Sequence, residues 1–176
     1  MTGETEIEIR RLAPEEVRGQ VDALAGVLHD CVDGGASVGY MAPFSIDDAR
    51  EAFAGFAAEA EAERRLLLAA FADGTLVGTV QVVLALPPNQ PHRGEIAKLL
   101  VHRSVRGHGV ARRLMEAAES EARAAGRTLL VLDAVTGGDA ARLYDRLGWT
   151  TVGVIPNYAL YPDGRPCDTT VFWKAL

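Results

Sequence analysis

A glycine-rich segment, VHRSVRGHGVARRL at residues 101–114, joins two apolar stretches of different character. Before it, GEIAKLLV (residues 94–101) has the content of a strand, and after it Ala, Leu and Met recur at the spacing of an amphipathic helix. Small residues let successive backbone N–H groups approach an anion, and a helix N-terminus adds partial positive charge. The segment therefore predicts a phosphate-binding turn between a strand and a helix. Three arginines can add formal charge there: Arg106, Arg112 and Arg113.

Two other interpretations of this segment remain open. A glycine-rich turn with exposed arginines needs no ligand at all. A dinucleotide-binding unit also runs strand, glycine loop, helix and strand, and Asp133 stands where its ribose-binding acid would. However, several residues separate Val101 from Gly107, and Arg112 takes the place of the third glycine. We therefore favour a phosphate site of a different kind.

The rest of the chain predicts an α/β domain with about seven strands and four helices. Asp73-Gly74, between two apolar runs, is typical of a hairpin, and Ser45 resembles a helix N-cap. The expected strands cover residues 6–10, 66–71, 75–83, 95–101, 128–133, 150–155 and 167–173, and the expected helices cover 14–28, a stretch from 46 onward, 111–125 and 140–147.

The composition and net charge of the chain exclude several classes of function. With 176 residues and 48% hydrophobic content, the chain can form one core, so we expect a single domain over residues 1–176. A formal net charge of −6 argues against a nucleic-acid binder and suits a cationic partner. Cys31 and Cys167 lack the spacing of a metal site or disulfide framework. No apolar run approaches the ~18 residues of a membrane span. We expect a cytoplasmic protein without a metal, a nucleic-acid partner or a membrane partner.

The loop RGHGVA (residues 106–111) and the downstream AARLYDRLGW (residues 140–149) together resemble the GNAT acyltransferase superfamily, across nearly the whole chain. The resemblance implies a GNAT-type fold with a central, mixed, twisted sheet, and acetyl-CoA as the acetyl donor. It also implies a homodimer as an open alternative to a monomer. The residues implied to bind acetyl-CoA are Leu100, Val101, Arg106, Gly107, His108, Gly109, Val110 and Ala111. One departure is the absence of an asparagine near Gly137 that many members use to contact the pantetheine arm.

A narrower resemblance is to the tabtoxin-resistance acetyltransferases, which detoxify a small amine-bearing β-lactam. It is carried by GEIAKLLV (94–101), Leu132-Asp133, GVIPNY (153–158) and PDG (162–164). The resemblance implies that Glu95 and Asp133 act together as the general base. It also implies antibiotic or toxin resistance as the biological context.

Each candidate catalytic residue also has a purely structural interpretation. Acyl transfer to an amine needs a proton acceptor, stabilisation of an oxyanion and a proton donor for the leaving thiolate. Glu95 can instead be a strand-edge charge, and Asp133 can cap the turn toward Thr136. Tyr144, the superfamily's usual acid, can be a packed aromatic whose hydroxyl also reaches the cleft. The resemblance implies a backbone N–H near Leu100 or Val101 as the oxyanion donor, where two parallel strands separate.

The function expected from these residues is transfer of an acetyl group from acetyl-CoA directly to the amine of a small molecule. Tyr158, Tyr161 and Asp163, expected in a loop before the last strand, can line the acceptor pocket or simply form a polar hairpin tip. Acetylation of a protein N-terminus or lysine is the nearest alternative. A catalytically silent CoA-binding module is another, but it would not need Asp133 and Tyr144 together.

Overall fold

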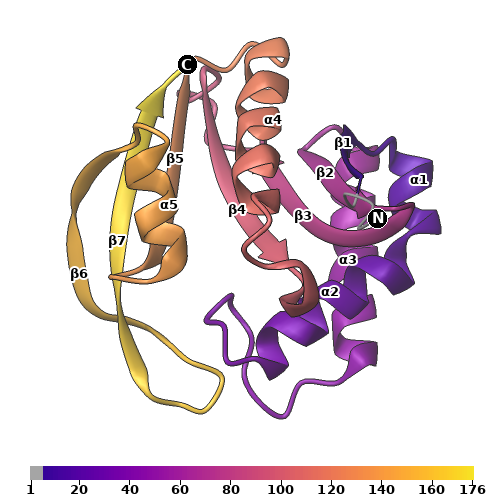
Figure 1. Ribbon diagram of the computed structural model, residues 1–176. Helices are drawn as coiled ribbons and strands as arrows, with labels where there is room; N and C mark the ends of the chain where they lie inside the picture. Colours follow the sequence, from indigo (N-terminus) through magenta and orange to yellow (C-terminus); the bar gives the residue numbers. More distant parts are fainter. Residues whose placement is uncertain (1–5) are drawn as a thin grey trace.

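The computed structural model describes residues 6–176; the first five residues of the expected domain lie outside the described part. It contains a seven-stranded open sheet flanked by five α-helices, which matches the predicted fold class (Figure 1). The elements are β1 (Ile7–Arg11), α1 (Pro14–Gly19), α2 (Val21–Asp33), α3 (Ile46–Glu61), β2 (Arg65–Ala72), β3 (Thr75–Val83), β4 (Arg93–Val101), the 3₁₀ helix η1 (Arg103–Val105), α4 (Val110–Ala124), β5 (Leu129–Val135), α5 (Asp139–Arg146), β6 (Thr150–Leu160) and β7 (Pro166–Ala175).

The first expected helix, over residues 14–28, is two helices, which corrects the predicted count of four. Gln20, at φ −105° and ψ 8°, leaves the helical conformation and separates α1 from α2. The helix α2 then runs five residues further than expected, because Cys31 and Val32 continue its buried face. Gly34 and Gly35 follow its end, and Gly35 adopts a φ of +86°.

The β2–β3 hairpin forms at the predicted turn. Asp73 and Gly74 have φ values of 47° and 80°, and Ala72 pairs with Thr75 across them. A two-residue hairpin turn with both central residues at positive φ matches the right-handed twist of the strands, which is why Asp-Gly is a strong signal.

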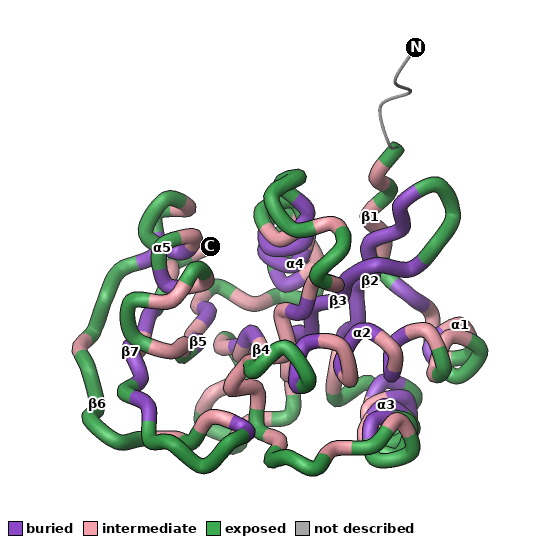
Figure 2. Tube along the Cα trace, turned by 60° about the horizontal axis from the view of Figure 1, so that its bottom comes forward, coloured by how far each residue is buried: buried purple, intermediate pink, exposed green. Residues whose placement is uncertain are grey.

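The sheet separates two hydrophobic clusters. On β2, Leu66 and Leu68 belong to the cluster beneath α4 and α5, whereas Leu67 and Ala69 belong to the cluster beneath α1, α2 and α3. Alternate side chains of a strand point to opposite faces, so a strand covered on both faces is buried throughout. Figure 2 shows this contrast between the buried β2 and the edge strand β6, which is exposed along most of its length.

The two halves of the sheet separate in its middle. The order is β1-β2-β3-β4-β5-β7-β6, and the only parallel pair among residues 6–176, β4 with β5, is joined from Arg93 to Glu95 alone. Beyond Glu95 the two strands diverge, and β5 remains paired with β7. A β-bulge at Lys98, whose φ is +51°, interrupts the pairing of β4 with β3 just before Leu100. The sheet is therefore open at the carboxyl ends of its two parallel strands.

None of the helices in residues 6–176 combines the length and hydrophobicity needed to cross a membrane.

Candidate active site

The glycine-rich loop presents unpaired backbone donors at the start of α4. Within the described chain, the N–H groups of Gly107, His108 and Gly109 make no hydrogen bond to protein. Gly109 is the N-cap of α4 at φ +74°, and a Cβ built on Gly107 or Gly109 would meet nothing within 4 Å. Free N–H groups at the N-terminus of a 15-residue helix, with open space before them, fit a phosphate group. The chain thus has a site that suits the pyrophosphate of CoA.

The three arginines near the loop differ in what they contact. The Arg106 guanidinium turns back toward the protein, with Nε 3.3 Å from Val101 O and Nη2 3.8 Å from Cys31 Sγ. Arg112 pairs with Glu116 at 2.8 Å. Arg113 is exposed, and its side chain makes no hydrogen bond or ion pair within the described chain, so it is the arginine best able to meet a ligand phosphate.

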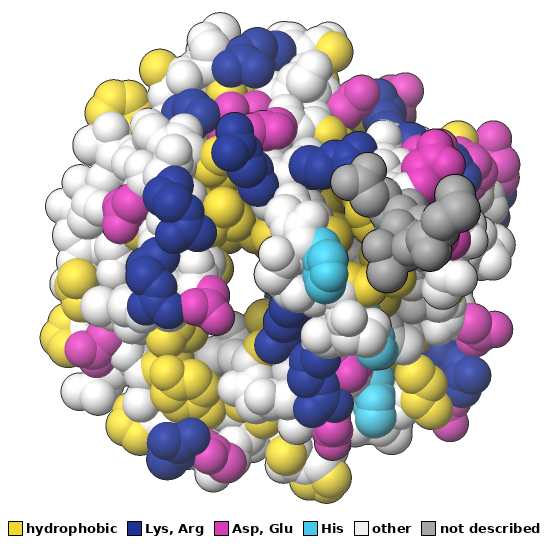
Figure 3. Space-filling view, in the orientation of Figure 1, with side chains coloured by type: hydrophobic (Ala, Val, Ile, Leu, Met, Phe, Trp, Pro, Cys, Tyr) yellow, Lys and Arg dark blue, Asp and Glu magenta, His cyan; other side chains and the backbone are white. Residues whose placement is uncertain are grey.

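The diverging strands leave the edge of β4 free beside this loop. Beyond Glu95, the edge of β4 that faces β5 has no strand partner, and this stretch includes Leu100 and Val101. Figure 3 shows an opening through the molecule here, between α5 and the end of β4. Unpaired main-chain groups along such an edge can bind an extended ligand as a further strand would.

Asp133 lies on β5 at this opening, where its backbone pairs with Val171 of β7, and its carboxylate makes no hydrogen bond or ion pair with residues 6–176. Desolvation raises the pKa of its carboxyl group, and the charge of Glu95 raises it further, whereas Lys98 lowers it. The Thr136 N–H donates to Asp168 O rather than to Asp133, so the turn-capping interpretation does not hold. An unpaired carboxylate with a raised pKa is a suitable proton acceptor.

Glu95 is the last residue of β4 that pairs with β5, opposite Val131. Its carboxylate accepts from Arg93 Nη1 at 2.7 Å and its side chain is 45% exposed. Glu95 is close enough to raise the pKa of Asp133, so the structure brings the two acids together across the two strands. The contact with Arg93 also keeps the strand-edge interpretation open for Glu95.

Tyr144 lies on α5 and is 4% exposed. Its ring packs against Trp149 and Phe172, with centroid distances of 5.9 and 5.5 Å. Burial and the charge of Asp133 raise the pKa of its phenol, which keeps the hydroxyl protonated. The hydroxyl has no hydrogen-bond partner in the described chain. Tyr144 is therefore both a packed aromatic and a protonated donor near Asp133.

Three further polar residues, which the sequence did not single out, lie on the sheet face opposite α4: Lys98, Arg65 and Gln81. Lys98 Nζ donates to Val38 O at 2.8 Å, and Arg65 binds Glu59 and Gln81 at 2.6 and 2.5 Å. The signal for Lys98 was its presence as a charge inside an apolar strand. Nothing in the local sequence indicated that the other two would lie near it.

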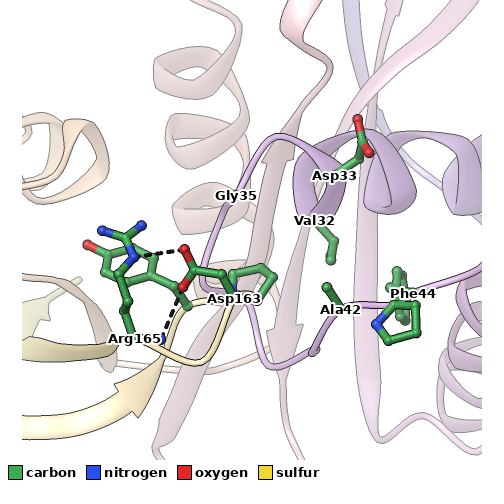
Figure 4. Close-up of a pocket in the computed structure, with 10 residues that line it drawn as sticks. Val32, Asp33, Gly35, Ala42, Phe44, Asp163 and Arg165 are labelled. Carbon is green, nitrogen blue, oxygen red and sulfur yellow. Dashed lines mark hydrogen bonds and ion pairs between the residues drawn. The ribbon is translucent and has the colours of Figure 1, made fainter.

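A cavity of 490 Å³ lies between the α2–α3 loop (residues 34–45) and the tip of the β6–β7 hairpin (Figure 4). Tyr161 and Asp163 line it, and the Asp163 carboxylate accepts from the Arg165 side chain at 2.7 Å. Tyr158 does not line this cavity and lies within β6, which extends to Leu160, rather than in the expected loop. The Ala42 N–H donates to Pro162 O at 3.0 Å, so the two segments are tied together.

The remaining candidates do not form a second reactive centre. Cys31 and Cys167 are buried free thiols. Within residues 6–176, no cluster of His, Cys, Asp and Glu has the form of a metal site.

The interpretation of the glycine loop as a dinucleotide-binding unit is wrong. In the structure β4 and β5 share three paired positions and then diverge, with antiparallel strands on their outer sides.

The comparisons with known proteins agree with this geometry. Residues 36–149 match the Acetyltransferase (GNAT) family. An uncharacterized N-acetyltransferase of Azospirillum brasilense is 30% identical over 131 residues, which cover 73% of this chain and 76% of that protein. A crystal structure of an N-acetyltransferase from Staphylococcus aureus superposes with a TM-score of 0.80 at 20% identity, covering 97% of this chain and 99% of the other. YncA of Salmonella typhimurium, in a structure with its cofactor acetyl-CoA, gives 0.79 at 20% identity, covering 97% and 94%.

Proposed function

The chain belongs to the Acetyltransferase (GNAT) family and is therefore an acetyl-CoA-dependent N-acetyltransferase, and we propose that its acceptor is the amine of a small molecule. The observation that carries the proposal is the unpaired carboxylate of Asp133 at the opening of the sheet, with Glu95 beside it. Two acids favour an acceptor that enters as a cation, and an alkyl amine is mostly protonated at neutral pH.

In the proposed mechanism, Asp133 removes a proton from the bound ammonium group, so that the nitrogen lone pair can attack the acetyl carbonyl. The effect of Glu95 on the pKa of Asp133 supports a shared role for the two carboxylates. The thioester of acetyl-CoA supplies the acetyl group. A backbone N–H near Leu100 or Val101, on the free edge of β4, then donates to the developing oxyanion. As the C–S bond breaks, Tyr144 donates its phenolic proton to the departing thiolate, and the second proton lost by the attacking nitrogen restores the phenol.

In this proposal the glycine loop holds the acetyl donor. The N–H groups of residues 107–111 bind the pyrophosphate, and Arg106 supports the loop by holding the carbonyl of Val101. Gly107 and Gly109 keep the space before these donors clear. The missing asparagine near Gly137 leaves the free edge of β4 as the contact for the pantetheine arm.

The acceptor pocket that we propose suits a small molecule. The cavity of 490 Å³ between the α2–α3 loop and the β6–β7 hairpin is enough for a metabolite. The resemblance to the tabtoxin-resistance enzymes supports an amine-bearing toxin or antibiotic, or an amino-acid-like metabolite. We further propose that residues 1–176 work as one domain in the cytoplasm, where reducing conditions keep thiols such as Cys31 free.

A free-thiol release assay with acetyl-CoA tests the proposal across amino acids, dipeptides, aminoglycosides, polyamines, alcohols and carboxylate-only compounds. We expect amines to be acetylated and the alcohols and simple carboxylates to be inert, because only an ammonium group gains from the two acids. A peptide N-terminus as the best acceptor would support the protein-acetylating alternative. If a hydroxyl compound were the best acceptor, the assignment of Asp133 and Glu95 as the general base would be wrong.

Tyr144 gives a second test of the mechanism. Tyr144→Phe keeps the ring packing and removes only the hydroxyl, so turnover should fall by roughly 10²- to 10⁴-fold while CoA affinity stays unchanged. High pH should not rescue it, since a higher pH does not help to protonate the thiolate. Tyr144→Ala should in addition lower the free energy of unfolding by about 3–5 kcal/mol, as for other buried aromatics. Full turnover in Tyr144→Phe would show that Tyr144 is a packing residue and not the proton donor.

A further inference from the structure

Lys98 is a partly buried cation that no carboxylate of residues 6–176 neutralises at ion-pair distance. The chain's other lysine, Lys174, pairs with Glu119 at 2.8 Å. Burial lowers the pKa of the Lys98 ammonium group, and the charge of Arg65 lowers it further. An ammonium group withdrawn from water is normally paired, because its desolvation is otherwise not offset. Lys98 is therefore free to pair with an anionic ligand.

The backbone aims the Lys98 side chain at the acceptor side of the sheet. The β-bulge sets Lys98 at a φ of +51°, a conformation that is uncommon for residues with a side chain and that occurs often at binding sites. Its Nζ then donates to Val38 O at 2.8 Å and lies 5.2 Å from the centroid of the Tyr40 ring. Val38 and Tyr40 belong to the α2–α3 loop. One of the three N–H donors is used in this way, so two remain available to a ligand.

A second group close to Lys98 also has a hydrogen-bond donor without a partner in the described chain. Gln81 lies opposite Ala97, the residue before Lys98, and is fully buried. Its Oε1 accepts from Arg65, but its Nε2 has no partner in the described chain. Unpaired buried donors are rare in native proteins. This corner of the site therefore holds more donors than acceptors, as expected beside an anion-binding position.

We infer that the acceptor is an amine bearing a carboxylate a few bonds from its nitrogen, as in an amino acid, and that Lys98 binds this carboxylate beneath the α2–α3 loop. The site has a negative end at Glu95 and Asp133 and a positive end at Lys98. Lys98 lies within electrostatic reach of Asp133 without forming an ion pair with it. A zwitterion placed between the two ends satisfies both, with its ammonium group toward Asp133. This inference rests on the proposed function, because it names the acceptor class of the same site.

The test compares the twenty L-amino acids with their α-carboxamides as acceptors, in the wild-type enzyme and in Lys98→Met. We expect kcat/KM for the preferred amino acid to exceed that for its carboxamide by at least about tenfold. Lys98→Met should lower kcat/KM for the amino acid by roughly 10- to 100-fold, mainly through KM, and leave the carboxamide within about threefold. The amine of the carboxamide is less basic than that of the amino acid, so more of it is already deprotonated. This difference favours the carboxamide and therefore works against the expected preference for the amino acid.

Two further variants separate binding from structure. Lys98→Arg keeps the cation and should restore part of the preference for the carboxylate. Arg64→Met removes an exposed cation next to Arg65 in the sequence and should leave kcat/KM for the amino acid and for the carboxamide unchanged. Equal losses for amino acid and carboxamide in Lys98→Met would reduce Lys98 to an anchor for the α2–α3 loop and overturn the inference, as would a wild-type preference for uncharged amines.

The failure of the proposed function would look different. In that case no amine would release free thiol from acetyl-CoA in the wild-type enzyme. Calorimetric titration of the amino acids into the enzyme–CoA complex then decides the inference alone: binding weakened at least about tenfold by Lys98→Met supports it, and binding unchanged by Lys98→Met, or none at all, overturns it.

Discussion

Replacing Asp133 with asparagine should lower turnover by roughly 10²- to 10⁴-fold, the usual contribution of a general base. Asparagine has nearly the same shape but cannot accept the proton of the ammonium group. Raising the pH should restore part of the activity, because a larger fraction of the amine is then already deprotonated. Steady-state kinetics of thiol release between about pH 7 and pH 10 measure both effects.

The same substitution should not cost stability, and this separates a catalytic effect from a folding defect. The folded protein raises the pKa of Asp133, so the ionised carboxylate opposes folding as the pH rises above the usual aspartate range. Asp133→Asn removes that charge, so the melting temperature at pH 7 should equal or exceed that of the wild type. Asp145→Asn, an exposed change on α5, is the control and should retain full turnover.

Glu95→Gln refines the assignment of the base. Glu95 raises the pKa of Asp133, so its loss should move the acid limb of the pH–rate profile to lower pH. If the two carboxylates share the work, turnover should also fall, and the double variant should lose less than the product of the two single effects. Full activity in Asp133→Asn at pH 7 would move the base to another group altogether.

Replacing Gly109 with aspartate should weaken CoA binding by at least about 100-fold, since the new carboxylate would stand where free N–H groups meet a phosphate. The space before Gly109 is open to a side chain, and aspartate tolerates its φ of +74° better than most residues. The domain should therefore fold, and calorimetry with CoA measures the loss directly. NAD should not compete with CoA in the wild-type enzyme.

Gly126→Asp is a matched control at the other end of α4. Gly126 has a φ of +76° and equally open space, so the substitution adds the same charge and nearly the same backbone strain. It lies at the C-terminus of the helix, away from the loop, and should leave CoA affinity unchanged. A folded Gly109→Asp variant that binds CoA as tightly as Gly126→Asp would remove the phosphate site from the glycine loop.

Structural features that depend on neighbouring residues can be read from the sequence. The hairpin at Asp73-Gly74 forms because Gly, and to a lesser extent Asp, tolerates the left-handed turn, and the glycine loop precedes α4 because apolar spacing and small residues place it there. The break at Gln20 was missed because helical apolar spacing continues through it. Backbone preferences and periodicity act over a few residues, so they are readable from the chain alone.

The arrangement of the site was decided only by tertiary structure. Asp133, Tyr144 and Glu95 come from three elements, and each is an ordinary residue in its own segment. Glu95 and Tyr144 each lie within electrostatic reach of Asp133. For Glu95 this follows from the pairing of β4 with β5 at three positions, which depends on the register of strands far apart in sequence. The bulge that aims Lys98 at the α2–α3 loop likewise depends on the pairing of β4 with β3. Long-range pairing and packing set these positions, and no local pattern in the chain encodes them.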